Sequence, residues 1–245
     1  MHPCRVALDE DYHVHSTFSD GASTLAENVQ AARERGLSTL CLVDHVRRDT
    51  TWVPDFAAAV QRYRKQPGLR VLAGVEAKIL DSSGQLDVPP DLARCEDIDL
   101  VLIADHQFPA DHGPVHPGQV RAAISGGSMT AAEAIERLCL ATANALRPGA
   151  LLAHLFSLLP KIGLDEAAVP ASLLGDLAAE VARARVLVEV NEKWSCPSPR
   201  TVAALADAGV SLVAGSDSHH CRDVGVYGSV RQTVGTAGLA YEHGP

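Results

Sequence analysis

The chain has 245 residues with 21 basic and 30 acidic side chains, so its formal net charge is −9. This length suits one α/β barrel with its own core, and the acidic balance argues against a nucleic acid polymer as partner, because sequence-independent binding of nucleic acid needs a basic face. Six cysteines without a Cys-x-x-Cys pair, no apolar signal core in the first residues and no bilayer-length apolar stretch predict a single cytoplasmic domain over residues 1–245, with no membrane partner.

Short apolar runs alternate with longer, alanine-rich amphipathic segments along the chain. This alternation predicts the strands and crossover helices of a parallel sheet, and it favours an α/β barrel. The seven predicted strands cover approximately residues 6–14, 37–44, 69–80, 100–104, 150–153, 186–190 and 210–214. The predicted helices begin near Thr24, Pro54, Thr130, Pro170 and Pro199.

Two segments depart from this alternation. The link over residues 107–129 is long and rich in proline and glycine, so it is predicted to be a loop. Such loops often act as lids or bind substrate, and an irregular connection is the alternative interpretation. Residues 235–245 are predicted to form a flexible tail.

Histidines and carboxylates close almost every predicted strand. In His13-Val14-His15, the two-residue period of a strand puts both imidazoles on one face, and Asp217-Ser218-His219 repeats this arrangement near the other end of the chain. Any one of these residues alone would fit a hydrogen-bonded core or rim position. Together they predict a metal site, because the C-terminal ends of barrel strands meet at one mouth. The predicted ligands are His13, His15, Asp20, His45, Glu76, His106, His154, Asp217 and His219.

The charge of this set indicates what it would bind. Six neutral imidazoles and three carboxylates sum to about −3, so three divalent cations would leave the cluster near +3, and two would leave about +1. A positive cluster attracts a phosphate dianion. Mixed imidazole and carboxylate ligands suit Zn²⁺, Mn²⁺ or Fe²⁺.

Several cationic and aromatic side chains are predicted near the mouth. Lys78 follows Glu76 by two residues and should share its face, whereas Arg47 and Arg48 follow His45 on a loop. The predicted substrate-binding residues are Lys78, Arg48 and Arg222, with solvent-exposed side chains as the alternative. Lys161 and Lys193 are weaker candidates, Trp52 and Trp194 are candidate stacking platforms or packing residues, and Asp44 and Asp105 are candidates for orienting ligands.

The chain resembles the polymerase and histidinol phosphatase (PHP) family of metal-dependent phosphoesterases. The matching motifs are His-Val-His-Ser-Thr-Phe-Ser-Asp at 13–20, Val-Asp-His at 43–45, Gly-Val-Glu at 74–76, Ala-His at 153–154 and Gly-Ser-Asp-Ser-His at 215–219. The resemblance implies a distorted (β/α)7 barrel of TIM-barrel type. It also implies that all nine ligand positions of the fuller family members are occupied.

The resemblance further implies how three ions would be shared. One buried ion would take His13, His15, Glu76 and Asp217. Glu76 would bridge to a second ion held by His106 and His154, and a third would be held by Asp20, His45 and His219. The predicted catalytic residues are Glu76, Asp217 and His219, with a metal-bridging hydroxide attacking phosphorus.

The predicted activity is hydrolysis of a small phosphorylated metabolite, with a phosphate monoester as the favoured substrate. The +3 cluster and the nearby cations would prefer a dianion to a diester monoanion. Two alternatives are an amidohydrolase-like metal hydrolase, which would not need Asp20 or the Asp-x-His pair, and a metal-binding PHP domain without turnover. The sequence predicts no particular oligomeric state.

Overall fold

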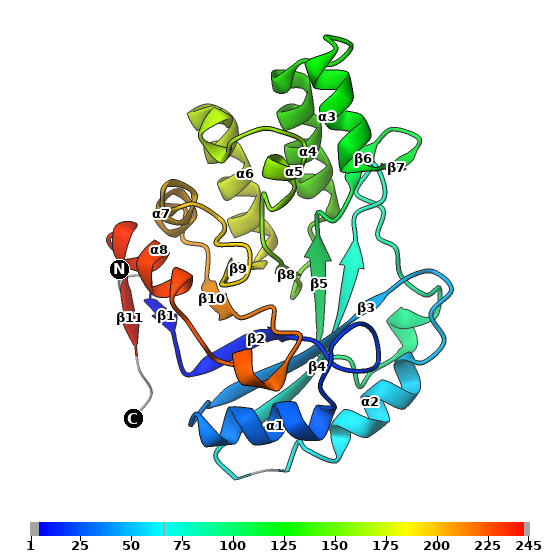
Figure 1. The fold of residues 1–245 in the computed structure, drawn as a ribbon, viewed down its shortest axis with the longest axis vertical. Helices are drawn as coiled ribbons and strands as arrows, with labels where there is room; N and C mark the ends of the chain where they lie inside the picture. The colour runs from blue at the N-terminus through cyan, green and yellow to red at the C-terminus, as the bar shows by residue number, and fades with distance from the viewer. Residues whose placement is uncertain (1–4, 66, 243–245) are drawn as a thin grey trace.

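Seven parallel strands form the centre of the molecule in the computed structural model, which describes residues 5–65 and 67–242 (Figure 1). Their order is β10-β9-β8-β5-β4-β3-β2, with neighbouring strands parallel. The strands are β2 (Glu10–Val14), β3 (Thr39–Val46), β4 (Arg70–Lys78), β5 (Leu100–Ala104), β8 (Leu151–Leu152), β9 (Leu187–Asn191) and β10 (Leu212–Gly215).

The two ends of this sheet come together just beyond β2 and β10. The His15 N–H donates to the Ser218 carbonyl at 2.8 Å, and Val14 forms a parallel bridge with Ser218. These contacts nearly close the sheet into a barrel. The predicted seven-stranded α/β barrel is therefore confirmed.

Helices cover the outside of the strands. Figure 1 shows α1 (Leu25–Glu34) and α2 (Val53–Gln61) on one flank, and α4 (Ala131–Ala145) and α6 (Ala171–Ala184) on another. The other helices are α3 (Pro117–Ser125), α5 (Leu158–Lys161), α7 (Pro199–Asp207) and α8 (Ser229–Thr236), with short 3₁₀ turns at Leu92–Arg94, Glu166–Ala168 and Cys221–Asp223. The five predicted helix starts are confirmed to within one residue of the observed helix or its N-cap.

Two of these helices begin with the same local signal. Thr24 and Thr130 each accept the N–H of the glutamate three residues later, and that glutamate accepts the threonine N–H in return. Such a capping box satisfies two of the backbone N–H groups that a helix start leaves without partners.

The two-residue period of the strands places the polar cluster directly above the barrel core. On β3, Cys41 and Val43 pack inside the barrel, while Leu40 and Leu42 pack outward against α1 and α2. The inward face of the same strand then reaches His45. The inward series on β4 and β5 likewise end in polar side chains, and so the cluster lies at the C-terminal mouth.

Three predicted elements differ from the structure. The segment 6–14 is split, because its first part forms β1 (Arg5–Ala7), which pairs with β11 (Ala240–Glu242) instead of joining the barrel. The prediction of a flexible tail is therefore wrong for residues 235–242, and residues 243–245 lie outside the described part of the chain. Both strands are three residues long, and a long-range pairing of such short runs leaves little periodic signal.

The link over residues 107–129 is also more regular than predicted. It contains an antiparallel hairpin of β6 (Phe108–Ala110) and β7 (Gly113–Val115), followed by α3. Gly113 has a φ of +121°, a conformation suited to glycine, and His116 Nδ1 accepts the Gly118 N–H to cap α3. Its glycines and prolines therefore shape a turn and a helix start.

Among residues 5–65 and 67–242, no helix combines the length and the apolar character needed to cross a membrane.

Candidate metal centre

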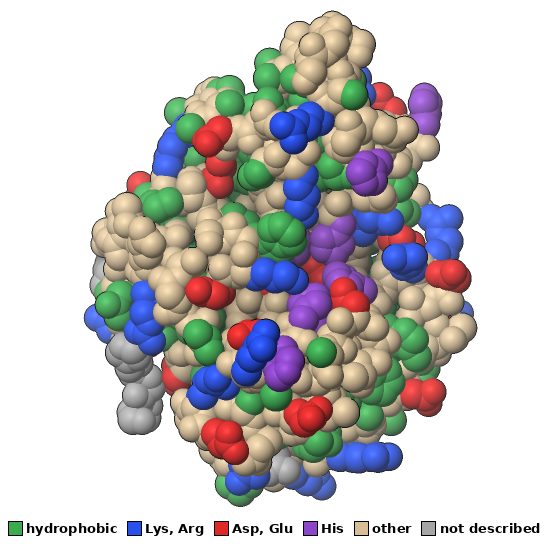
Figure 2. Space-filling model, in the orientation of Figure 1, with side chains coloured by type: hydrophobic (Ala, Val, Ile, Leu, Met, Phe, Trp, Pro, Cys, Tyr) green, Lys and Arg blue, Asp and Glu red, His purple; other side chains and the backbone are tan. Residues whose placement is uncertain are grey.

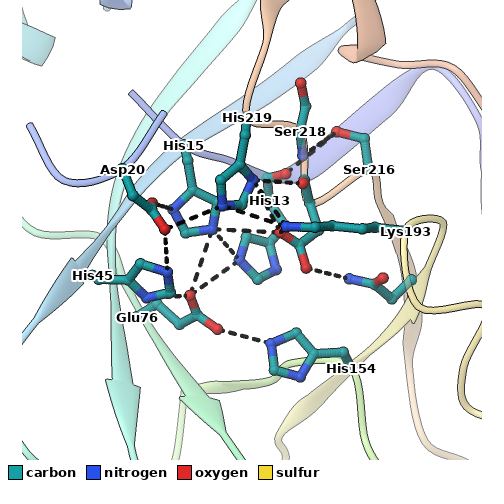
Figure 3. Close-up of polar contacts among 12 residues, drawn as sticks. His13, His15, Asp20, His45, Glu76, His154, Lys193, Ser216, Ser218 and His219 are labelled. Carbon is teal, nitrogen blue, oxygen red and sulfur yellow. Dashed lines mark hydrogen bonds and ion pairs between the residues drawn. The ribbon is translucent and has the colours of Figure 1, made fainter. Parts of the chain in front are cut away.

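Glu76 lies at the centre of the cluster at the barrel mouth (Figure 3). Its Oε1 is 2.9 Å from His106 Nε2 and 2.8 Å from His154 Nε2. Its Oε2 is 2.8 Å from His45 Nδ1 and 3.5 Å from Nε2 of each imidazole in the His-Val-His motif. One buried carboxylate thus contacts histidines from several different strands.

Asp20 forms the outer edge of the cluster. Its Oδ2 lies 3.3 Å from His45 Nε2 and 3.4 Å from His219 Nε2, and its Oδ1 lies 3.6 Å from His15 Nδ1. Asp44 shapes the turn that carries this carboxylate, because it accepts the backbone N–H groups and hydroxyls of Ser16 and Ser19. Asp44 thus acts on the site from outside, as the sequence suggested.

Asp217 closes the cluster on the opposite side. Its Oδ1 lies 3.6 Å from His15 Nε2 and 3.4 Å from His219 Nδ1, and its Oδ2 accepts the indole N–H of Trp194 at 2.9 Å. The Lys193 ammonium reaches in to 3.2 Å from Oδ1. The structure therefore brings all nine predicted ligands together and adds a lysine that the sequence ranked as a weak candidate.

Two buried atoms of the cluster lack hydrogen-bond partners within the described chain. They are His15 Nδ1 and Glu76 Oε2, although the latter lies 2.8 Å from His45 Nδ1. A buried polar atom without a partner is costly, and a bound cation would satisfy both atoms. Three groups of ligand atoms lie within 4.8 Å of one another: His15 with Asp20, His45 and His219; His13 with His15 and Glu76; and His45 with Glu76 and His106. The donors and their spacing fit divalent cations.

The cluster holds two central groups in the protonation states that bind metal. Burial alone would raise the pKa of Glu76, but the field of His106 and His13 holds that pKa well below its usual value, so the side chain is a carboxylate. Burial and the neighbouring His13 lower the pKa of His15 well below its usual value, so this imidazole is neutral. Carboxylates and neutral imidazoles are the forms that ligate cations. Burial alone would lower the pKa values of His13 and His154, but nearby carboxylates raise the first well above its usual value and the second to about 10, so a cation would displace a proton from each of these two imidazoles.

Glu189 contacts two histidines of the cluster and is not among the residues predicted from the sequence. It is fully buried on β9; its Oε1 lies 2.9 Å from His13 Nδ1, and its Oε2 accepts the His154 N–H at 2.7 Å. His154 has a φ of +31°, a conformation that side-chain-bearing residues rarely adopt, so this bond helps hold an unusual backbone. The sequence feature that could have identified Glu189 is its position inside the apolar run 186–190, where a buried charge needs a partner.

Gly215 makes room for this glutamate. A Cβ at Gly215 would lie 2.7 Å from Glu189 Cδ and closer still to Oε1. Glycine is therefore required at position 215 because its backbone lies close to the Glu189 carboxylate beneath the cluster.

Other neighbours of the cluster position its members. Asp105 lies 3.5 Å from His154 Nδ1 and accepts the Leu158 N–H, consistent with the orienting role suggested for it. Trp194 donates to Asp217, and the ammonium of Lys161 lies 3.9 Å from its ring centroid. Trp52, the other candidate stacking platform, packs instead against Phe18 and Phe56.

The predicted substrate-binding residues are separated in the structure. Lys78 lines a cavity beside the cluster, as expected. Arg48 lines a different cavity with Pro54 and Pro89, while its neighbour Arg47 lines the cavity at the cluster. The Arg222 side chain is 75% exposed, and its Nε lies 3.5 Å from Asp223. The structure therefore does not bring Arg48 or Arg222 to the cluster.

Known proteins share this sequence pattern and fold. A probable phosphatase of Vibrio vulnificus strain YJ016 is 27% identical over 239 residues, covering 95% of this chain and 86% of the relative. A probable phosphatase of Caldanaerobacter subterraneus is 25% identical, with coverages of 90% and 80%.

A crystal structure of histidinol phosphate phosphatase from Lactococcus lactis, complexed with zinc, L-histidinol and phosphate, has the same fold. Its TM-score is 0.67 at 16% identity, and the match covers 95% of this chain and 94% of that one. Residues 11–193, more than half of the chain, match the family model described as the PHP domain. The chain therefore belongs to the PHP domain family.

Proposed function

We propose that this protein is a metal-dependent phosphatase that releases phosphate from a small phosphomonoester. The observation that carries the proposal is the convergence of nine imidazole and carboxylate side chains around Glu76, with buried donor atoms that lack partners in the described chain. The curated relatives, which are named probable phosphatases, support the enzyme class. The PHP family match supports metal dependence.

Three metal positions would use all nine side chains. The contacts of Glu76 with His106 and His154 support one position, and those of Asp20 with His45 and His219 support an outer one. The third would combine Asp217 and Glu76 with the His-Val-His imidazoles, at contacts of 3.5 to 3.6 Å. Zn²⁺, Mn²⁺ and Fe²⁺ all suit these donors, and the Lactococcus lactis structure contains zinc.

The chain's own residues would perform three tasks in this reaction. Glu76 contacts donors of every proposed position, so it fixes their spacing. Asp217 is held by Trp194 and Lys193 and would keep its carboxylate toward the reacting centre. His219 is 28% exposed at the mouth, where a substrate can approach. Bound divalent cations would supply positive charge for the phosphate group and lower the pKa of water.

The amidohydrolase-like alternative would not need Asp20, and the position of Asp20 supports the phosphatase proposal instead. Asp20 contacts three imidazoles although its side chain is 53% exposed. A cation shared by Asp20 and these histidines would account for this placement.

A direct assay tests the proposal. Protein purified without chelator should contain divalent metal and, with Mn²⁺ or Zn²⁺, should hydrolyse p-nitrophenyl phosphate faster than bis-p-nitrophenyl phosphate. The reason is that a cluster near +3 attracts a dianion more strongly than a monoanion. Equal or faster diester turnover would contradict the monoester preference. Bound metal without turnover of either compound would favour a binding domain over a phosphatase.

Glu189→Gln should weaken metal binding while leaving every proposed ligand in place. The amide keeps the size of the side chain but loses the charge that faces His13 Nδ1. Removing a partner that orients a metal-binding histidine typically costs roughly 10- to 100-fold in metal affinity or activity. Competition with a fluorescent chelator would measure this. Glu180→Gln, on the outside of α6, is the matched control, and an unchanged affinity in Glu189→Gln would show that Glu189 does not orient the site.

A further inference from the structure

A cavity of about 640 Å³ opens beside the cluster. Figure 2 shows histidines gathered in a hollow of the surface, with charged side chains around it. Four cluster residues line the cavity: Asp20, His45, Glu76 and His106. This space is therefore within reach of the rest of a molecule whose phosphate group lies at the cluster.

Polar and charged residues make up most of the lining that faces that part of the substrate. Val46 is the one apolar residue among the described residues that line it, and none of them is Phe, Tyr or Trp. Trp52, the nearby candidate platform, is used in packing against Phe18 and Phe56. Trp194, the other candidate, is exposed but lines a separate opening of the cluster. Recognition of a nucleoside usually relies on an aromatic stacking partner, so the lining of this cavity favours a non-aromatic substrate.

The two cationic side chains that line the cavity, Lys78 and Arg47, differ in whether a carboxylate balances their charge, and Lys78 is balanced. Asp87 is 8% exposed; its Oδ2 lies 3.5 Å from Lys78 Nζ, and its Oδ1 accepts the Arg48 N–H. Lys78 also donates to Gln107 Oε1 at 3.2 Å, so the ammonium is fixed and its charge is balanced by Asp87. These three side chains form a polar surface with no net charge.

Arg47 adds a positive charge that nothing in the described chain balances. It is exposed, and its guanidinium makes no hydrogen bond or ion pair with another described residue. Its backbone N–H donates to Thr50 Oγ1 at 2.8 Å, which holds the start of the loop in place. A guanidinium matches the two oxygens of a carboxylate or phosphate.

We propose that this cavity binds the alcohol half of the substrate and selects one that is small, non-aromatic and anionic, with Arg47 contacting the negative charge. The charge would be a carboxylate or a second phosphate group, because both present paired oxygens. The inference rests on the proposed phosphatase activity at the adjacent cluster. Arg47 acts here as a specificity-determining residue.

A panel of phosphomonoesters tests the selection. The anionic compounds are 3-phosphoglycerate, with a carboxylate, and fructose 1,6-bisphosphate, with a second phosphate. The comparators are glycerol 3-phosphate, AMP and histidinol phosphate, whose alcohol halves are neutral, aromatic and cationic. At least one anionic compound should exceed glycerol 3-phosphate in kcat/KM by about tenfold, the effect of one hydrogen bond to a charged group. The anionic compound with the higher kcat/KM shows whether a carboxylate or a second phosphate supplies the negative charge that Arg47 contacts.

Variants at neighbouring arginines assign the effect to one side chain. Arg47→Gln should reduce the preference for the anionic compound over glycerol 3-phosphate by about tenfold, mainly through KM. Arg48→Gln is the matched control, because Arg48 lines another cavity, and it should keep the preference. Glycerate should also inhibit p-nitrophenyl phosphate hydrolysis competitively, and this inhibition should weaken in Arg47→Gln.

Lys78→Ala should change selectivity in the same direction by a different route. Without the ammonium, the Asp87 carboxylate keeps its charge in the cavity wall and repels an anionic alcohol. We therefore expect a higher KM for the anionic compound at unchanged metal content, measured by elemental analysis.

Two failures are distinguishable. No turnover of p-nitrophenyl phosphate with any metal would remove the phosphatase activity itself. Turnover with equal or greater kcat/KM for glycerol 3-phosphate, AMP or histidinol phosphate would overturn the selection for an anionic alcohol and leave the phosphatase in place. An unaltered preference in Arg47→Gln would overturn the role of Arg47.

Discussion

Asp217→Asn should lose bound metal and phosphatase activity together. Burial raises the pKa of Asp217, but the field of His13 and His154 lowers it below its usual value, so the side chain is a carboxylate. An amide has the same shape and no charge. In either orientation of the asparagine side chain, its NH₂ group would also face another hydrogen-bond donor, because Oδ1 lies near the Lys193 ammonium and Oδ2 accepts from Trp194.

The expected loss is larger than that of an orienting residue. We expect turnover of p-nitrophenyl phosphate to fall by more than the roughly 10- to 100-fold typical of groups one step removed from a metal. Elemental analysis should show fewer metal ions per chain, and His13→Ala should behave in the same way. Asp207→Asn, at the exposed end of α7, controls for the substitution itself. Wild-type metal content and turnover in Asp217→Asn would exclude Asp217 as a ligand.

The sequence could predict the barrel and the convergence of the nine side chains for one physical reason. Most of these residues lie at the end of an apolar strand. The two-residue period of the strand places each of them on the same face as the inward core residues that precede it. On β3 this series runs through Cys41 and Val43 to His45, and on β4 it includes Leu72 and continues through Glu76 to Lys78. Local pattern and global fold agree at these positions.

Glu189 and Arg47 show where that reasoning stops. Glu189 lies within an apolar run instead of at its end. Its contact with the cluster can therefore be predicted only when the inward face of β9 is known. Arg47 and Arg48 follow the strand on a loop, where side-chain direction depends on backbone dihedrals that no periodicity fixes. The sequence placed two arginines near the mouth, and only the structure distinguishes which one lines the cavity at the cluster.

Gly215→Ala should destabilise the whole protein, because its side chain would occupy the space of Glu189. The Gly215 backbone is not in the left-handed region, so the requirement for glycine is one of space. The new methyl group would displace the carboxylate from His13 Nδ1 and the His154 N–H. Breaking a buried ionic contact costs about 3–5 kcal/mol, and overpacking adds about 1–3 kcal/mol. Even a loss of about 3 kcal/mol would lower Tm by roughly 6–12 °C in a chain of this size.

A double-mutant cycle separates this mechanism from a general loss of fold. Glu189→Ala removes the three atoms nearest to the new methyl group, all within 3 Å of it, so adding Gly215→Ala to it should cost far less than in the wild type. Gly175→Ala is the matched control: the position lies in α6 with nothing within 4 Å of a Cβ, so the alanine should stabilise the helix by about 0.5–1 kcal/mol. Equal costs of Gly215→Ala in both backgrounds, measured by calorimetry, would show that Gly215 serves some purpose other than admitting Glu189 beneath the metal ligands.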